Sequence, residues 1–394
     1  MNGPAMSRRH CVIAACLPPV LLLLSCATPG AAANEPPPNV VIIFTDDQGY
    51  GDLGCFGSET LQTPRIDALA EEGLRLTSFY VSAAVCSPSR AALLTGCYHK
   101  RISVNKVLFP GELIGLNPNE TTIAEMLKPR GYATACIGKW HLGDQPEFLP
   151  TRQGFDEFFG IPYSNDMYPQ NNLRHKFPPL PLMQDEEVIE TNPDQDELTQ
   201  RLTDRAVEFI ERSREKPFFL YFAHPMPHRP CHASAEARRA VGLADREIPS
   251  YPQKTPDNDF VYPATMYDID LSTGRIIDKL RELKLDRRTL VIFTSDNGPA
   301  VGSAGPLRGR KGAPQEGGMR VPFVAWWPGE IAGGGESEAI AATIDLLPTI
   351  AAISGADLPE KPIDGVNLWP LLAGRPDIAP PRETFLYYRG ASLA

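Results

Sequence analysis

The chain has 394 residues and a formal net charge of −10 at pH 7. Hydrophobic residues make up 42% of it, which is enough to fill one large core or two smaller ones and argues against an intrinsically disordered chain. The acidic balance argues against nonspecific binding to nucleic acid.

Residues 1–33 are typical of an export signal. A pair of arginines precedes an apolar run over residues 11–26, which is short for a bilayer span and is interrupted by two prolines, so we expect no transmembrane helix. Two processing sites compete. The sequence LLSC would leave a lipid anchor on Cys26, whereas the small residues at 31–34 suit ordinary signal peptidase. Both predict a protein exported to the periplasm or the extracellular space.

Five of the eight cysteines lie beyond the export signal: Cys55, Cys86, Cys97, Cys136 and Cys231. Their number is odd, and their spacing shows neither a CxxC pair nor a dense disulfide framework. At least one of them is therefore expected to be unpaired or to have another role.

Strand and helix signals alternate along the remaining chain, 39–394. The apolar run NVVIIFT at 39–45 predicts a strand covered on both faces. A helix is predicted over 63–73, with Thr63 as its N-cap and Gly73 just past its end. The other predicted elements are a strand at 74–81, a short helix starting just after Cys86, a helix at 120–131, a strand at 132–138, a helix at 196–215, a strand at 217–224, a helix at 263–283, a strand within 289–298, a Gly-rich loop at 299–320 and a strand at 321–329. This alternation predicts an α/β domain with a mostly parallel sheet flanked by helices.

Polar side chains follow four of these strands. Because ligands bind beyond the carboxyl ends of parallel strands, we expect residues far apart in the sequence to converge on one rim. The residues at these strand ends are Asp46, Asp47, Lys139, His141, His224, His228, Asp296 and Asn297.

The two acidic pairs offer only oxygen ligands. Three carboxylates and one amide suit a hard cation such as Ca²⁺ or Mg²⁺ and do not suit zinc. Either pair alone would more often be ordinary turn residues after a strand. Two such pairs at matching strand ends favour a metal site.

Cys86 lies just before the start of a predicted helix, whose free amides and dipole would favour a bound anion. A buried structural cysteine, a disulfide, a thiolate nucleophile and a modified cysteine are all compatible with this position. Single lysines and histidines are more often surface or packing residues than catalytic ones. As a set, however, they could supply cations and proton donors for an anionic ester: Arg90, Lys139, His141, His228 and Lys311.

Two longer motifs carry a family resemblance. The sequence AVCSPSRAALLTG at 84–96 resembles the first signature of the formylglycine-dependent (type I) sulfatases, and GYATACIGKWH at 131–141 resembles the second. The stretches FTDDQGYGDLG, GIPYSND and TSDNGP occur in the family's order, and the nearest branch is that of arylsulfatase A and N-acetylgalactosamine-6-sulfatase. The resemblance implies an alkaline-phosphatase-like α/β fold and a sulfuric ester hydrolase. Its substrate would be an aryl sulfate, a sulfated glycan or a sulfated glycolipid.

The resemblance also implies what Cys86 does. A formylglycine-generating enzyme would read Cys86, Pro88 and Arg90 and oxidise the cysteine to Cα-formylglycine (3-oxoalanine). One hydroxyl of the hydrated aldehyde would attack sulfur and form a covalent sulfo-enzyme, and the second would then expel sulfate. Calcium, with magnesium as the less expected ion, would be held by Asp46, Asp47, Asp296, Asn297 and the modified Cys86.

The remaining roles follow from the same resemblance. Arg90 would orient the diol, and His141 would be the base for the elimination step. Of the two histidines after one strand, His228 fits the family better than His224, and with Lys311 it would help to protonate the leaving oxygen. The residues implied to bind the sulfate group are Lys139, Ser164, His228 and Lys311.

The sequence leaves alternative functions open. The family usually continues into a small C-terminal antiparallel subdomain, and this chain stops where that part would begin, so we expect the subdomain to be missing or truncated. An inactive fragment, a carbohydrate-binding pseudoenzyme and a phosphate or phosphonate monoester hydrolase are the alternative functions. Phosphatases of this core generally use serine or threonine with paired zinc, so Cys86 and the oxygen-only ligand set favour the sulfatase.

Overall fold

The computed structural model describes residues 36–169, 176–243, 259–375, 380–389 and 392–393, besides Met1 and Gly3. The described residues from Pro36 onward belong to one structural unit. Nearly all of the predicted export segment, including Cys26, lies outside the described residues. Within the described ranges no helix is both long and apolar enough to cross a membrane.

A ten-stranded sheet organises this unit. Its strands are β1 (Asn39–Thr45), β2 (Leu74–Leu76), β4 (Ala133–Lys139), β5 (Glu157–Ile161), β6 (Pro181–Gln184), β7 (Glu187–Thr191), β8 (Phe218–Ala223), β9 (Thr289–Ser295), β11 (Phe323–Trp326) and β12 (Gly335–Ser337). They lie in the order β12-β2-β11-β9-β1-β8-β4-β5-β6-β7. The five central strands, from β9 to β5, are parallel, and antiparallel pairings flank them on both sides. The predicted α/β class is confirmed, with antiparallel edges added to the parallel centre.

The remaining strands form two small sheets. One contains β3 (Phe79–Tyr80), β10 (Arg320–Val321) and β13 (Ala341–Ala342), and the other pairs β14 (Tyr388–Arg389) with β15 (Ser392–Leu393).

Strand β1 lies near the middle of the sheet, and its side chains enter the core on both faces. Val40 and Ile42 pack into the core on one face of the sheet, whereas Val41 and Ile43 pack into the core on the other. All seven residues of β1 are buried. The sequence-based prediction of a strand covered on both faces is confirmed.

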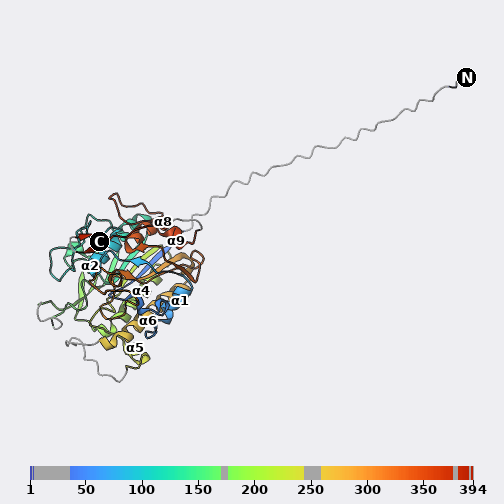
Figure 1. The fold of residues 1–394 in the computed structure, drawn as a ribbon. Helices are drawn as coiled ribbons and strands as arrows, with labels where there is room; N and C mark the ends of the chain where they lie inside the picture. Colours follow the sequence, from blue (N-terminus) through green and yellow to red (C-terminus); the bar gives the residue numbers. More distant parts are fainter. Residues whose placement is uncertain are drawn as a thin grey trace. The chain divides into compact units, whose positions relative to one another are not determined.

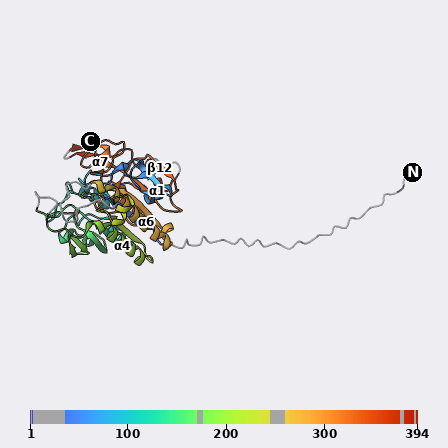
Figure 2. The same ribbon diagram turned by 90° about the horizontal axis from the view of Figure 1, so that it is seen from below.

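Helices cover both faces (Figure 1). One face carries α1 (Pro64–Glu71), α4 (Gln195–Arg212), α5 (Ala235–Ala240) and α6 (Tyr262–Glu282). The other carries α2 (Cys86–Thr95), α3 (Ile123–Leu127), α8 (Leu346–Ser354) and α9 (Trp369–Leu372). Helices α4 and α6 lie side by side (Figure 2). The short helix α7 (Glu316–Met319) lies in the predicted Gly-rich loop.

Helix α1 is capped from a distant helix. Thr63 occupies the predicted N-cap position, but its hydroxyl bonds Asp67 and does not cap the helix. Instead Asp270 of α6 accepts hydrogen bonds from the backbone amides of Arg65 and Ile66, at 3.0 and 2.8 Å. One buried carboxylate therefore satisfies two of the free amides at this helix end.

The prediction of one strand over 74–81 is wrong. The chain forms β2 in the main sheet and β3 in a small sheet, with Thr77 and Ser78 between them. The amide of Thr77 donates to Ser337 O, and its carbonyl accepts from Tyr50 Oη. Because these backbone groups of Thr77 bond Ser337 and the Tyr50 side chain, the strand is interrupted at this residue.

Candidate active site

The ends of the neighbouring strands β1 and β9 bring two acidic pairs together. The amide of Asp47 donates to Asp296 Oδ1 at 3.0 Å, and Asn297 Nδ2 donates to Asp47 Oδ1 at 2.7 Å. Asp47 has a φ of +61°, a left-handed conformation that few non-glycine residues adopt. Such conformations often persist at functional sites, where the surroundings enforce them.

Helix α2 carries the cysteine and the arginine of the first motif. Cys86 is its first residue, and Arg90 follows one turn later. Arg90 Nε and Nη2 donate to Asp296 Oδ2 at 3.1 and 2.8 Å, and Nη1 donates to Lys139 O at 3.2 Å. The guanidinium also lies over the ring of Phe44, 5.4 Å from its centroid. The arginine therefore fixes α2 against the ends of β9 and β4.

Two lysines reach the same rim from different parts of the chain. Lys139, the last residue of β4, bonds Asp46 Oδ2. Lys311, from the Gly-rich loop, donates to Asp47 Oδ2 at 2.7 Å and to His228 Nε2 at 2.9 Å. Each lysine neutralises one carboxylate, as the arginine of α2 does for the third.

His141 is held with one ring nitrogen engaged and the other available. Its Nε2 donates to Leu108 O at 2.9 Å, and the amide of Leu108 in turn donates to Ser87 Oγ at 3.1 Å. The Nδ1 atom is buried and has no hydrogen-bond partner among the described residues. Burial, aided by the charges of Lys139 and Arg90, holds the pKa of His141 well below its ordinary value. The ring is therefore neutral, with a free lone pair on Nδ1 that can accept a proton.

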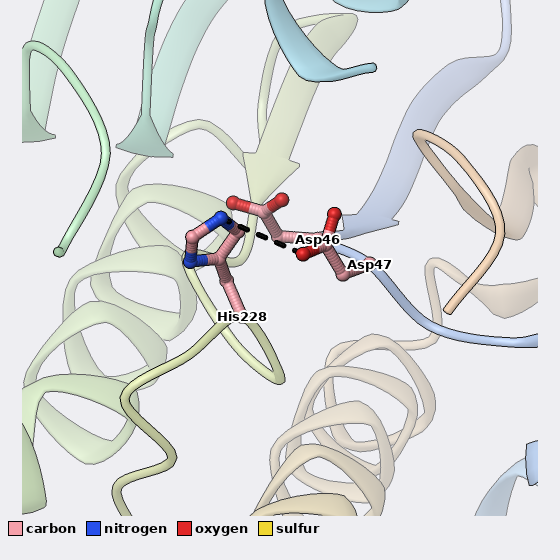
Figure 3. Close-up of side chains that lie close together, drawn as sticks. All are labelled: Asp46, Asp47 and His228. Carbon is pink, nitrogen blue, oxygen red and sulfur yellow. Dashed lines mark ion pairs between the residues drawn. The ribbon is translucent and has the colours of Figure 1, made fainter. Parts of the chain in front are cut away.

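The side chains of Asp46, Asp47 and His228 form a compact group (Figure 3). His228 Nε2 lies 3.5 Å from Asp47 Oδ2, but Nε2 also accepts from Lys311, and Nδ1 donates to the carbonyl of the next residue. By contrast, Asp46 Oδ1 and Asn297 Oδ1 are buried, and the described part of the chain offers them no donor. The unsatisfied atoms are oxygens, so the residues present fit a hard divalent cation better than zinc.

Burial and neighbouring charges shift the pKa values of the site's ionisable groups in different directions. Burial raises the pKa of the Cys86 thiol to about 11, although Lys139 and Lys311 act against it. Burial alone would raise the pKa of Asp46, but nearby cations, Lys139 first, hold it far below its usual range. Burial and the charge of Asp46 raise the pKa of Asp296 to about 7. A cation bound among these carboxylates would favour their ionised forms.

The positions of two further candidates differ. Ser164 Oγ accepts a hydrogen bond from Lys139 Nζ at 3.0 Å, which places it at the rim. His224 lies elsewhere: its Nε2 is 3.4 Å from Ser272 Oγ on α6, and its ring packs on Phe222. The structure brings together Asp46, Asp47, Cys86, Arg90, Lys139, His141, Ser164, His228, Asp296, Asn297 and Lys311.

Two residues that position this site were not predicted from the sequence. Ser87 and Leu108 form the link from α2 to His141. The contact to His141 uses a backbone carbonyl, for which no side-chain signal exists. All five cysteines from Cys55 onward are free, and no disulfide occurs among the described residues.

This combination of a parallel-centred sheet, a residue at a helix N-terminus and a buried cluster of carboxylates and cations is typical of hydrolases of anionic esters with an alkaline-phosphatase-like α/β fold. The chain belongs to the sulfatase family, whose model matches residues 38–356. It is accordingly a sulfuric ester hydrolase.

The relatives span the branch indicated by the sequence motifs. The chain is 40% identical to arylsulfatase A of Homo sapiens, over 88% of this chain and 69% of the relative. It is 37% identical to N-acetylgalactosamine-6-sulfatase of Sus scrofa, over 88% of this chain and 68% of the relative. Among solved structures, the PsFucS1 sulfatase from Pseudoalteromonas sp. superposes with a TM-score of 0.76 and 30% identity, over 90% of this chain and 75% of that chain.

Proposed function

We propose that this protein hydrolyses sulfate monoesters of aryl or carbohydrate alcohols with a formylglycine nucleophile derived from Cys86. The observation that carries the proposal is the state of this cysteine. It is 2% exposed, it begins α2 beside Arg90, and its pKa of about 11 keeps the thiol protonated at neutral pH. A protonated, buried thiol is a poor nucleophile, so oxidation to the aldehyde is the more effective use of this position.

The hydrated aldehyde has two hydroxyls, and each has one task. The first attacks sulfur: an oxygen–sulfur bond forms, and the bond from sulfur to the leaving oxygen breaks. The second hydroxyl then loses its proton, the carbon–oxygen bond to the sulfate breaks, and the aldehyde is restored. His141 Nδ1 is the acceptor we assign to this proton, because its neighbours keep the ring neutral.

The cations around the nucleophile suit the sulfate group. Lys139 and Lys311 provide charge, Ser164 provides a hydroxyl beside Lys139, and His228 lies in contact with Lys311. We assign sulfate binding to these four residues, and protonation of the leaving oxygen to His228 with Lys311. Arg90 is fixed by three hydrogen bonds to Asp296 and Lys139 and would orient the diol.

Calcium is the ion we propose for the oxygen-rich pocket, with magnesium the less suitable alternative. Its ligands would be Asp46, Asp47, Asp296, Asn297 and the modified Cys86. The Oδ1 atoms of Asp46 and Asn297, which have no hydrogen-bond donor among the described residues, support this set. When bound, such a cation polarises a sulfate oxygen and lowers the pKa of a nearby hydroxyl.

Two steps would precede activity in the cell. We propose that residues 1–33 direct export, with lipid attachment at Cys26 as one of two processing routes, and that 39–394 form the catalytic domain. A formylglycine-generating enzyme would act on Cys86 during maturation.

The test combines mass and activity. The tryptic peptide Leu76–Arg90 contains the proposed modification site, and we expect it to carry an aldehyde when the protein is made in a competent host. Hydrolysis of 4-nitrophenyl sulfate should rise with the aldehyde fraction and should exceed hydrolysis of 4-nitrophenyl phosphate. An active preparation in which this peptide is wholly free thiol would overturn the proposal, and a preference for the phosphate ester would favour the phosphatase alternative.

A further inference from the structure

A buried series of hydrogen bonds connects the first turn of α2 to His141. The carbonyl of Leu108 accepts from His141 Nε2 at 2.9 Å, and the amide of the same residue donates to Ser87 Oγ at 3.1 Å. All three residues are buried, and Ser87 directly follows Cys86 in α2. The turn that carries the proposed nucleophile therefore also anchors the residue that we assign as its base.

The contact with Leu108 determines which ring nitrogen of His141 carries the hydrogen. A carbonyl oxygen can only accept a hydrogen bond, so Nε2 is the protonated nitrogen of the neutral ring, and Nδ1 retains its lone pair. Nδ1 is buried and has no hydrogen-bond partner among the described residues, so the ring is held through Nε2. Loss of that contact would free the ring to turn or to take the other tautomer, and either change moves the lone pair.

The hydroxyl of Ser87 is a buried support for the Leu108 peptide. Neighbouring contacts of the same loop are more exposed: Lys106 pairs with Glu112, and the amide of Phe109 donates to that carboxylate at 3.2 Å. An exposed ion pair contributes little stability, whereas a buried amide that loses its acceptor bears the full cost of its desolvation. We therefore expect removal of the Ser87 hydroxyl to displace the Leu108 peptide.

We propose that Ser87 is a positioning residue for His141, and that it acts through Leu108 to fix the orientation and tautomer in which Nδ1 can accept a proton. The inference rests on the proposed function, in which His141 removes the proton of the second hydroxyl and takes no part in the attack on sulfur. Loss of the Ser87 hydroxyl should therefore slow the release of sulfate from the sulfo-enzyme and leave the first release of alcohol unchanged.

Ser89 provides a matched control on the same helix. Its side chain is also buried, but its Oγ has no hydrogen-bond partner among the described residues. Ser87 and Ser89 occupy the two positions between Cys86, Pro88 and Arg90, so Ser87→Ala and Ser89→Ala make the same chemical change within one motif. The aldehyde fraction of each variant is measured by peptide mass, and every rate is expressed per aldehyde, which removes any effect on maturation.

NMR of protein labelled with ¹⁵N at histidine tests the contact without turnover. We expect a slowly exchanging imidazole proton on Nε2 of His141, assigned by its loss in His141→Gln, because a buried hydrogen bond protects such a proton from water. The signal should vanish in Ser87→Ala and persist in Ser89→Ala. Persistence in Ser87→Ala would overturn the proposal. So would a hydrogen on Nδ1 of His141 in the wild-type protein, a result that does not depend on the folding of Ser87→Ala.

Rapid-quench kinetics with 4-nitrophenyl sulfate tests the consequence for the reaction. The decay of the sulfo-enzyme, followed by intact mass, should be about tenfold or more slower in Ser87→Ala than in Ser89→Ala, which is part of the roughly 10²–10⁴-fold that a positioned base provides. Release of the first alcohol should agree within about twofold between the two variants. Equal slowing of both steps would indicate a general structural defect and refute the proposal, as would an unchanged decay.

The two measurements together separate this inference from the proposed function. An Nε2 signal that depends on Ser87, in a protein whose aldehyde form neither hydrolyses sulfate esters nor forms a sulfo-enzyme, would refute the proposed function and retain the positioning of His141. Hydrolysis through a sulfo-enzyme, with neither the His141 signal nor the decay dependent on Ser87, would refute the positioning alone.

Discussion

Replacement of Cys86 by serine would leave one hydroxyl where the hydrated aldehyde has two. That hydroxyl retains the surroundings that favour attack on sulfur, because Lys139, Lys311 and Arg90 remain in place. We therefore expect a first turnover that releases about one alcohol per site and leaves sulfate on the serine. In a host that does not oxidise serine in this motif, the covalent intermediate should accumulate as a burst.

The loss of steady-state turnover in Cys86→Ser can be estimated from the geometry of the site. Sulfate on serine has no neighbouring hydroxyl from which His141 Nδ1 could remove a proton, so the elimination route is lost. Only water could release the sulfate, and the position of Cys86 is 2% exposed. Loss of proton transfer by a positioned base costs roughly 10²–10⁴-fold in rate, or about 3–5 kcal/mol in the barrier. Steady-state turnover should fall by at least this range.

Rapid-quench measurement of the released alcohol and intact mass of the protein test this expectation. Cys97→Ser is the matched control, because Cys97 is 3% exposed, contacts Pro362 O and lies just past the C-terminal end of α2. This control introduces the same buried hydroxyl and should keep multiple turnover. Sustained turnover of Cys86→Ser near the wild-type rate, with no sulfated protein, would show that the second hydroxyl is unnecessary.

Three other predictions concern the metal, the base and the fold. A chelator should lower both activity and thermal stability, and Ca²⁺ should restore them better than Mg²⁺, because two buried oxygens of the pocket lack donors; full activity with no bound divalent ion would contradict this. Because the pKa of His141 lies well below 6.5, the histidine stays in its basic form as the pH falls to 6.5, so single-turnover desulfation of the sulfo-enzyme should show no loss there; a decline centred near 6.5 would indicate an ordinary histidine. Asp270→Ala should reduce the free energy of unfolding in urea by about 1–2 kcal/mol through the lost cap of α1, whereas Asp278→Ala, which breaks an exposed pair with Arg65, should cost less than about 0.5 kcal/mol; equal losses would contradict the capping role.

Four of the five central strands, β1, β4, β8 and β9, were predictable because they are buried on both faces, whereas β5 and the edge strands β6, β7 and β12 were not predicted. The run at 39–45 can be recognised without its partners, since four consecutive β-branched apolar residues followed by Phe44 are typical of a doubly covered strand. The site followed from topology: acidic pairs after β1 and β9 had to meet once those strands were adjacent and parallel. Of the two histidines after β8, His228 contacts the carboxylate group and His224 contacts Ser272, and the role assigned to His228 stays a prediction.

Other features depend on contacts that no local pattern records. The break between β2 and β3 follows from partners such as Ser337, far along the chain. The capping of α1 by Asp270 and the carbonyl of Leu108 behind His141 are also long-range contacts. Lys100 and Tyr388, far apart in the sequence, line one cavity. In each case the sequence supplies the chemistry but not the proximity.

Under the proposed function, the burial of α2 would set a time limit on maturation. Every residue of this helix is buried, including the Cys86, Pro88 and Arg90 that an oxidising enzyme would have to read. Arg90 is held by Asp296, which lies 206 positions further along the chain, so this contact of the motif forms only when the end of β9 is in place. Under the proposed function, oxidation of Cys86 would compete with folding, and the aldehyde content of a preparation would record which was faster. Conditions that slow the addition of β9 should yield fewer folded molecules per hour but a larger fraction that can turn over.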